Sequence, residues 1–302
     1  MDEIEFEAGD AYERRRLIEY GQKMRAEDEQ RRHEDRELQM QTAYLRMRLG
    51  DFYVRTGKID RALGEYKRAI KMDGKNAVFR TRLGDTYALK DMVQQAIAQY
   101  RMAIQYDPEL PDPRLSLGDL YRRFGMFVQA VEQYRIAVEV EPTRGYYRFK
   151  LADSLAAIGR LLDAVQELRA AVRLDPDEAF YRFRLGNLYL RLGWSKEAKS
   201  ELLAATRLAP WDDYYLIRYG VASLGTGRIV EAIDAFRAAL RLAPENRCYR
   251  VLLADAYAEA GLEEEADRML LQAGELDSYE MEFVGRRRLE LKQAARDAAQ
   301  GQ

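Results

Sequence analysis

The sequence has very few of the residues on which disulfide, metal and histidine chemistry depends. It contains one cysteine, Cys248, and one histidine, His33, in 302 residues. One cysteine excludes a disulfide framework within the chain, and the two residues together cannot build a Cys/His zinc site or a histidine-based catalytic triad. We therefore expect no metal and no cofactor.

An excess of one charge and long apolar runs are also absent. The 49 Lys and Arg residues nearly balance 51 Asp and Glu residues, which gives a formal net charge of −2 and argues against a strongly basic nucleic-acid binder. No apolar run approaches the roughly 20 residues of a membrane span, so we expect no membrane insertion. The acidic start, Met1–Gly9, does not resemble an export signal. A cytoplasmic location follows as the expectation, and a lone cysteine agrees with it.

Prolines are few, but their spacing is regular. Five of the seven are 34 residues apart, at Pro108, Pro142, Pro176, Pro210 and Pro244. Glycines at 50, 84, 118, 186 and 220 and alanines from Ala62 to Ala266 keep the same step. An unbroken step of this length indicates a repeat array. It predicts seven units, at 43–76, 77–110, 111–144, 145–178, 179–212, 213–246 and 247–280.

Each unit is predicted to form two helices. In the third, Gly125 permits the left-handed turn that ends a first helix. Ala130, Tyr134 and Ala137 then lie on one face of a second helix, which Pro142 stops. One such hairpin cannot bury its apolar face alone, so neighbouring units must stack.

These residues resemble the tetratricopeptide repeat. The second unit shows the whole pattern, with Leu83, Gly84, Tyr87, Ala96, Tyr100, Ala103 and Pro108. The resemblance covers 43–280 and implies an all-α, right-handed α-solenoid superhelix of antiparallel helix pairs. One departure is regular: Arg stands where the family often has Trp, as at Arg80 and Arg148, and an aromatic residue usually precedes it. We expect that aromatic residue to take over the bulky packing role.

Both ends differ from the repeats. The sequence of residues 1–42 predicts a charged helical segment. This segment either caps the array or contacts a partner through Leu17, Ile18 and Tyr20. Residues 281–302 resemble the helix that closes arrays of this family. Its apolar residues Phe283, Val284, Leu289 and Leu291 are expected to cover the last repeat.

An acidic series on the first helices is the strongest candidate for chemistry. It consists of Asp51, Asp85, Asp119, Asp153 and Asp255. Paired carboxylates can perform acid–base catalysis when they converge on one bond. Successive first helices should instead place these side chains about 8–10 Å apart in a ladder, each with a nearby cation. We therefore predict a charge-balanced surface and no catalytic residue.

The resemblance also implies where a ligand binds. In this family the second, fifth, ninth and twelfth places of the first helix tend to line a concave groove. From the fourth unit to the sixth these places become apolar or aromatic, and the predicted groove residues are Tyr146, Phe149, Phe180, Phe183, Leu190, Tyr214, Ile217, Val221 and Leu224. An exposed apolar patch marks an interaction site. The alternative is that these side chains pack between repeats.

These observations predict a non-catalytic protein-interaction scaffold that binds a peptide or amphipathic helix. The family's clamps for chaperone C-termini need cations where this chain has apolar residues or Asp, so the chain does not resemble such a clamp. Two alternatives are kept. One is a structural subunit that stacks or forms homo-oligomers. The other is an RNA-binding repeat protein, suggested by the arginine series but opposed by the adjacent Asp residues, and no nucleic acid is expected.

Overall fold

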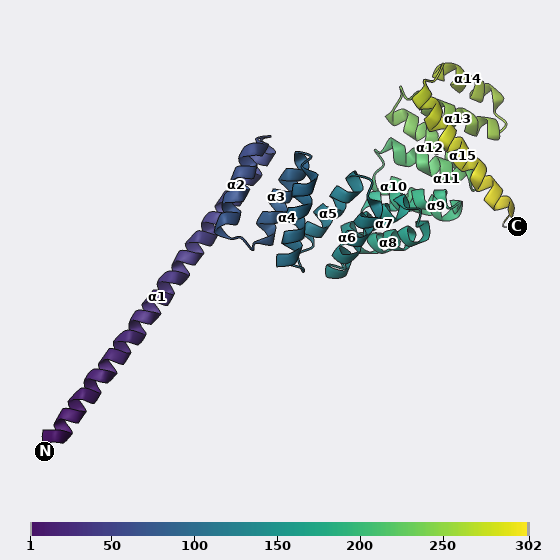
Figure 1. Ribbon diagram of the computed structural model, residues 1–302. Helices are drawn as coiled ribbons and strands as arrows, with labels where there is room; N and C mark the ends of the chain where they lie inside the picture. The colour runs from purple at the N-terminus through teal and green to yellow at the C-terminus, as the bar shows by residue number, and fades with distance from the viewer. Residues whose placement is uncertain (1, 301–302) are drawn as a thin grey trace. The chain divides into compact units, whose positions relative to one another are not determined.

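The structure is a computed structural model that describes the backbone of residues 2–300 and the side chains of Tyr20 and residues 22–291. Within that part of the chain there are fifteen α-helices and no strand. The first helices of the seven predicted repeats are α1 (Asp2–Arg55), α3 (Ala77–Leu89), α5 (Asp112–Arg123), α7 (Gly145–Ala157), α9 (Ala179–Arg191), α11 (Asp213–Leu224) and α13 (Arg247–Glu259). The second helices are α2 (Ile59–Met72), α4 (Val93–Tyr106), α6 (Phe127–Val140), α8 (Leu161–Leu174), α10 (Ser195–Leu208), α12 (Ile229–Leu242) and α14 (Glu263–Ala273), and α15 (Ser278–Gln300) follows (Figure 1). The predicted all-α array of helix pairs is confirmed.

The chain forms two compact units. Unit 1 covers residues 1–117 and unit 2 covers residues 118–302, so their boundary lies within α5. In each unit, first helices pack on second helices of the same repeat and of the preceding one. Among the described helices none is long and apolar enough to cross a membrane.

In unit 1, the charged N-terminal segment and the first helix of the first repeat form one continuous helix. No break occurs at residue 42, and α1 extends far beyond the helix pairs of its unit (Figure 1). The described side chains from residue 22 to residue 41 are exposed. One fixed contact there is the hydrogen bond that Gln39 Nε2 donates to the carbonyl oxygen of Met72, at 3.0 Å.

The repeated small residues allow two helix backbones to approach closely. A Cβ atom added at Gly84 of α3 would lie 2.6 Å from Cε1 of Tyr100 on α4, well inside van der Waals contact. Tyr100 is 1% exposed, and Ala96 and Ala103 beside it are fully buried. The spacing of Gly, Ala and Tyr in the sequence therefore fixes how the helices of one hairpin pack.

The turns and the aromatic substitution also follow the repeat. Gly125 ends α5 with φ of 71°, and Asp91 adopts φ of 57° at the same place in the second repeat, where glycine is missing. The aromatic residues before the arginine series are buried, at Phe79, Tyr147, Tyr181, Tyr215 and Tyr249. The expected shift of the packing role by one position is confirmed.

Candidate functional site

A continuous series of aromatic rings crosses the first helices of unit 2, and we call it the aromatic row. Ring centroids are 6.2 Å apart between Tyr146 and Phe149 and 5.3 Å apart between Phe149 and Phe180. The row continues to Phe183 at 6.2 Å and from there to Tyr214 at 5.6 Å. These separations are in the range in which aromatic pairs attract each other. The row therefore joins α7, α9 and α11.

The two ends of the aromatic row differ in exposure. Tyr146 and Phe180 are 40% and 38% exposed, whereas Phe183 is only 7% exposed. Phe149 and Tyr214 are partly buried. Rings available to a ligand are thus concentrated at the end formed by α7 and the start of α9.

Two cations lie against the exposed rings. Lys150 Nζ is 5.2 Å from the ring centroid of Tyr146, and Arg184 Cζ is 5.9 Å from that of Phe180. Arg184 also pairs with the carboxylate of Asp153. Burial, aided by nearby arginines, lowers the pKa of Arg184. This end of the row therefore combines apolar rings with cations that are themselves paired with carboxylates, Lys150 with Asp119 and Arg184 with Asp153.

A small cavity opens beside the same rings, between α7 and α9. Its volume is about 200 Å³. It is lined by Phe149, Ala152, Asp153, Ala156, Leu168, Arg184, Asn187, Leu188 and Arg191. One side chain of a partner would fill a space of this size, whose lining includes both polar groups and the ring of Phe149.

Five of the predicted groove residues are buried instead of facing a ligand. They are Phe183 (7% exposed), Leu190 (5%), Ile217 (0%), Val221 (1%) and Leu224 (8%). Phe183 shows the reason, because its ring stacks on Tyr215 of the next repeat with centroids 4.5 Å apart. For these five residues, packing between elements replaces the open surface that the sequence suggested.

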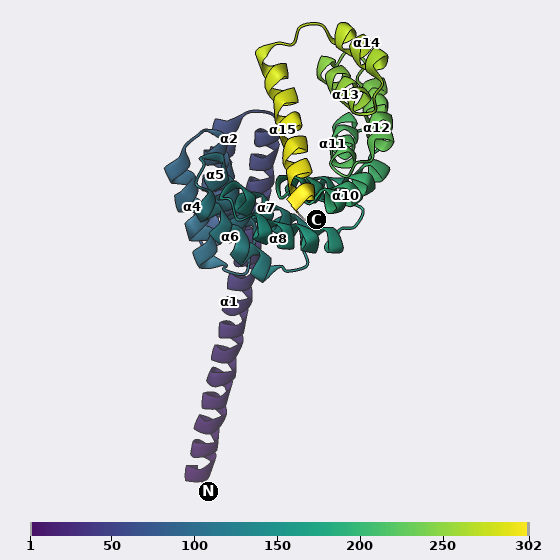
Figure 2. The ribbon, with the colours of Figure 1, turned by 90° about the vertical axis from the view of Figure 1, so that its right-hand side faces the viewer.

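The C-terminal helix α15 covers this part of the face. It packs against α13, α11 and α9 of its unit (Figure 2). The ring of Phe283 lies 6.5 Å from Tyr214 and extends the aromatic row, and Val284 is 3% exposed. Leu289, expected to cover the last repeat, is 66% exposed. The helix thus runs across the first helices of three repeats, a position that the sequence did not reveal.

Ion pairs hold α15 in place. Arg218 Nη1 lies 2.6 Å from Oε2 of Glu290, and Arg218 also donates to Asn187 Oδ1. Arg288 makes two hydrogen bonds to the carboxylate of Asp255, at 2.7 and 2.8 Å. Near the start of α15, Glu280 accepts from Arg247. Burial raises the pKa of Glu290.

The possible N-terminal contact arm lies largely outside this description. Leu17 and Ile18 are outside the described side chains. Tyr20 is 63% exposed.

The acidic series forms a ladder between successive repeats. Asp119 accepts from Tyr134 Oη of its own repeat at 2.6 Å and from Lys150 Nζ of the next repeat at 2.8 Å. The sequence suggested local partners instead, with Lys150 beside Asp153, which is three residues away. Asp51 is held in the same way by Tyr66 and Arg82. Asp153 and Asp255 pair with Arg184 and Arg288 of the following helices, so the series serves packing between elements.

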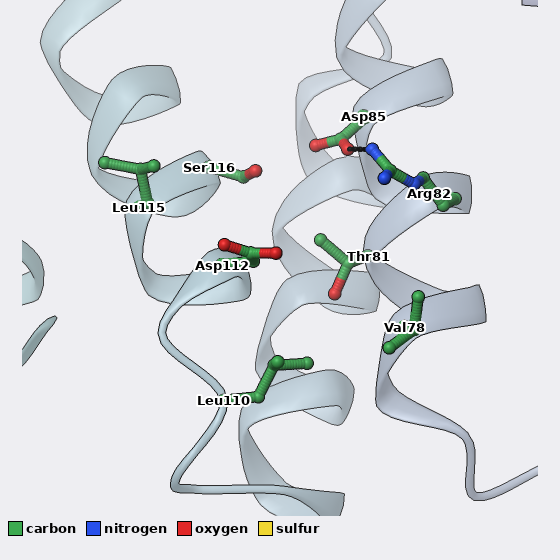
Figure 3. A pocket seen from close by; sticks show the side chains of 8 residues that line it. All are labelled: Val78, Thr81, Arg82, Asp85, Leu110, Asp112, Leu115 and Ser116. Carbon is green, nitrogen blue, oxygen red and sulfur yellow. Dashed lines mark ion pairs between the residues drawn. The ribbon is translucent and has the colours of Figure 1, made fainter. Parts of the chain in front are cut away.

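Asp85 lacks a cation from the following repeat, because Ser116 stands at the position that corresponds to Lys150 one repeat later. A cavity of about 240 Å³ lies here in unit 1 (Figure 3). Asp85 and Asp112 face it from opposite sides, and Arg82 lies 3.9 Å from Asp85. Burial raises the pKa of Asp85, although hydrogen bonds from Tyr100 and Ser116 oppose the shift.

The arginine series has a structural role. Arg148 donates to the carbonyl oxygen of Pro142 at 3.2 Å and to Glu167 at 2.8 Å. Arg182 repeats both contacts one unit later, with Pro176 and Glu201. These arginines join the preceding turn to the second helix of their own repeat, which leaves them neutralised.

Metal and thiol chemistry have little support. Among the described side chains no group of three or more His, Cys, Asp or Glu residues could hold a metal ion. Cys248 is buried against α15, where its Sγ lies 3.9 Å from the carbonyl oxygen of Glu280. Burial raises the pKa of this thiol, which disfavours the reactive thiolate.

Comparison with known structures finds the same fold elsewhere. YrrB, described as a TPR protein with an unusual peptide-binding site, shares 20% identity at a TM-score of 0.55, over 64% of this chain and 97% of its own. PilF of Pseudomonas aeruginosa shares 14% identity at a TM-score of 0.60, over 73% and 99%. A MamA structure shares 23% identity at a TM-score of 0.53, over 57% and 94%.

Comparison with families gives a more direct assignment. No curated protein matches the sequence. One tetratricopeptide repeat family profile matches residues 47–111, 115–179 and 183–247, and a second matches residues 223–278. These matches span most of the array, and the three matches of the first profile begin 68 residues apart, which is two steps of 34. The chain belongs to the tetratricopeptide repeat family.

Proposed function

We propose that this protein is a non-catalytic scaffold that binds a helical or extended segment of a partner protein through the exposed end of the aromatic row. The observation that carries the proposal is the pair of exposed rings, Tyr146 and Phe180, joined through Phe149 and flanked by Lys150 and Arg184. Aromatic rings beside a desolvated cation are typical anchors of protein interfaces. A segment with apolar side chains would complement the rings, since the two cations are already paired with Asp119 and Asp153.

The family supports this class of function, because stacked helical repeats present extended surfaces to partners. The carboxylates of the acidic ladder are engaged in packing, so the proposal includes no reaction and no cofactor. It also keeps the cytoplasm as the compartment, in agreement with the single, free Cys248.

The test is quantitative affinity capture from the native cell with three forms of the protein. The partner segment is mapped by cross-linking to the wild type. The double variant Tyr146→Ala, Phe180→Ala should weaken its binding by about thirtyfold or more, the effect of losing roughly 2 kcal/mol. Val230→Ala is the control, since Val230 is 73% exposed on α12, away from the row. Equal binding by both variants would contradict the proposal.

Self-association is the second candidate, and α1 supplies the observation in its favour. Leu38, Leu45 and Phe52 are 64%, 65% and 54% exposed. They are seven residues apart and so lie along one side of the helix. If these three side chains of α1 join two copies of the protein, Leu45→Glu will lower the molecular mass measured by light scattering. A monomeric wild type at high concentration would exclude it.

RNA binding is the third and weakest candidate. Its basis in the sequence was the arginine series, of which Arg148 and Arg182 are engaged with carboxylates and carbonyls. Phosphate binding requires cations that are free to exchange counterions. We therefore retain the protein partner.

A further inference from the structure

We propose that α15 is a displaceable internal ligand of the first-helix face of α9, α11 and α13, and that a partner's amphipathic helix of the same chemistry takes its place. The inference deepens the proposed function and rests on it, because it extends the partner surface along the aromatic row. The partner helix would carry an aromatic residue and, seven residues later, a carboxylate, as α15 does with Phe283 and Glu290.

The helix α15 does not continue the repeat array. Where earlier first helices have Gly or Ala for close packing on the second helix, the 34-residue step reaches Arg288. Arginine cannot enter that narrow space, and Arg288 instead extends to Asp255 on α13. The helix therefore lies on the surface of the array, in the manner of a bound ligand.

Its attachment combines ion pairs with a few apolar contacts. Ion pairs join it to α11 and α13 through Glu290, Arg288 and Glu280. Among its described apolar side chains, Val284 is buried and Phe283 and Leu291 are partly buried, whereas Met281 and Leu289 are 58% and 66% exposed. A non-helical connection, residues 274–277, precedes it. Such contacts can be exchanged for those of a second helix without disturbing the hairpins beneath.

The face beneath α15 requires an acidic partner. The side chain of Arg218 is 3% exposed, and its ion pair is made with Glu290. A helix that covered this face without a carboxylate would bury the cation with the neutral amide of Asn187. An uncompensated buried charge is strongly unfavourable, so a displacing helix must bring its own carboxylate. The ring of Tyr214, next to Phe283, selects for an aromatic residue beside it.

The experiment titrates a fluorescein-labelled peptide of residues 278–300 into the full chain. In the wild type α15 competes with the peptide. The apparent affinity then equals the intrinsic affinity multiplied by the small fraction of chains in which α15 has left the face. Glu290→Arg in the full chain weakens the resident helix, so the peptide should bind at least about tenfold more tightly. Hydrogen exchange of residues 278–291 should accelerate in the same variant.

The matched control is Glu282→Arg. It makes the same charge change on the same helix, but the partner of Glu282 is Arg286 of α15 itself. We expect its peptide affinity and exchange to equal those of the wild type. Phe283→Ala is a second release variant, meaning one that weakens the attachment of α15, and it introduces no charge. It serves if Glu290→Arg misfolds, and it should also tighten peptide binding.

Two results would overturn the proposal. One is equal peptide affinity in the wild type and both release variants. The other is unchanged affinity of a peptide that itself carries Glu290→Arg, because Arg218 would then not be the receptor. The titration needs no external partner, so it can fail while capture through Tyr146 and Phe180 succeeds, and the reverse also holds.

Discussion

Arg218 on α11 and Glu290 on α15 form an ion pair at 2.6 Å, across 72 positions of sequence, with only 3% of the arginine side chain exposed. A buried guanidinium must be compensated, so the C-terminal helix is part of the electrostatic balance of the repeats it covers. The pair lies next to Phe283 and Tyr214, where the aromatic row becomes covered.

We predict that Arg218→Met destabilises the protein. The substitution keeps the apolar length of the side chain but removes the guanidinium of Arg218 from Glu290, which keeps its two hydrogen bonds from Arg287 at 2.7 and 2.8 Å. Because Glu290 is also 24% exposed, we expect a loss of about 1–2 kcal/mol, the net contribution of one hydrogen bond between charged groups. Urea unfolding measures it. The exposed Arg237→Met on α12 should stay within about 0.5 kcal/mol of the wild type, and a loss of equal size there would refute the explanation.

The rings of the aromatic row should separate binding from stability. Phe183→Ala removes a buried ring that stacks on Tyr215, so it should cost about 3–5 kcal/mol of folding free energy. Phe180→Ala, one turn earlier and 38% exposed, should leave the melting temperature almost unchanged and weaken the partner instead. Thermal unfolding of both variants decides this. A large drop for Phe180→Ala would show that its ring is structural.

Close helix packing predicts a strong effect of one methyl group. Gly84→Ala places a Cβ 2.6 Å from Tyr100, whose ring is enclosed and cannot easily move. We expect a loss of about 1–3 kcal/mol, typical of overpacking. Gly64→Ala on α2 meets nothing within 4 Å and should gain about 0.5–1 kcal/mol through helix propensity. Equal effects in denaturant unfolding would contradict this packing.

The missing cation at Asp85 predicts a particular pH dependence. Burial raises its folded-state pKa, so the folded protein binds this proton more tightly than the unfolded chain. The corresponding stability is present below the ordinary aspartate pKa, about 4, and is lost as pH rises through the raised value. Asp85→Asn should remove that decline in urea unfolding measured from pH 4 to pH 7.

Ser116→Lys should compensate Asp85 directly. The new side chain would stand 31 residues after Asp85, as Lys150 stands 31 after Asp119 and pairs with it. Because the site is partly exposed, we expect a gain of about 0.2–1 kcal/mol at pH 7. In the Asp85→Asn background the gain should disappear. A gain that persists there would show that the introduced lysine acts through another group.

The hairpins were predictable because their determinants are local and repeated. A proline, a glycine and two alanines recurring every 34 residues specify helix ends and close contacts that short-range sterics alone decide. Even Asp91, which breaks the glycine series, adopts the left-handed turn that the period requires. The same regularity predicted the family and the burial of the aromatic residues before the arginine series.

The functional face was predictable only in part. The sequence placed Tyr146 and Phe180 on the first-helix face, and both are exposed there. It placed Ile217 and Val221 on that face in the same way, yet both are buried. Periodicity states which side of a helix a residue occupies, but burial depends on what else packs against that side.

The sequence by itself thus determined the hairpin, its length and its repetition, since these follow from steric and backbone preferences within one unit. The tertiary structure decided the partners of the charges: Lys150 with Asp119 of the previous repeat, and Arg218 with Glu290 far along the chain. Charges interact through space, so their pairing depends on distances between elements that no local pattern encodes. The position of α15 across α9, α11 and α13 was decided in the same way.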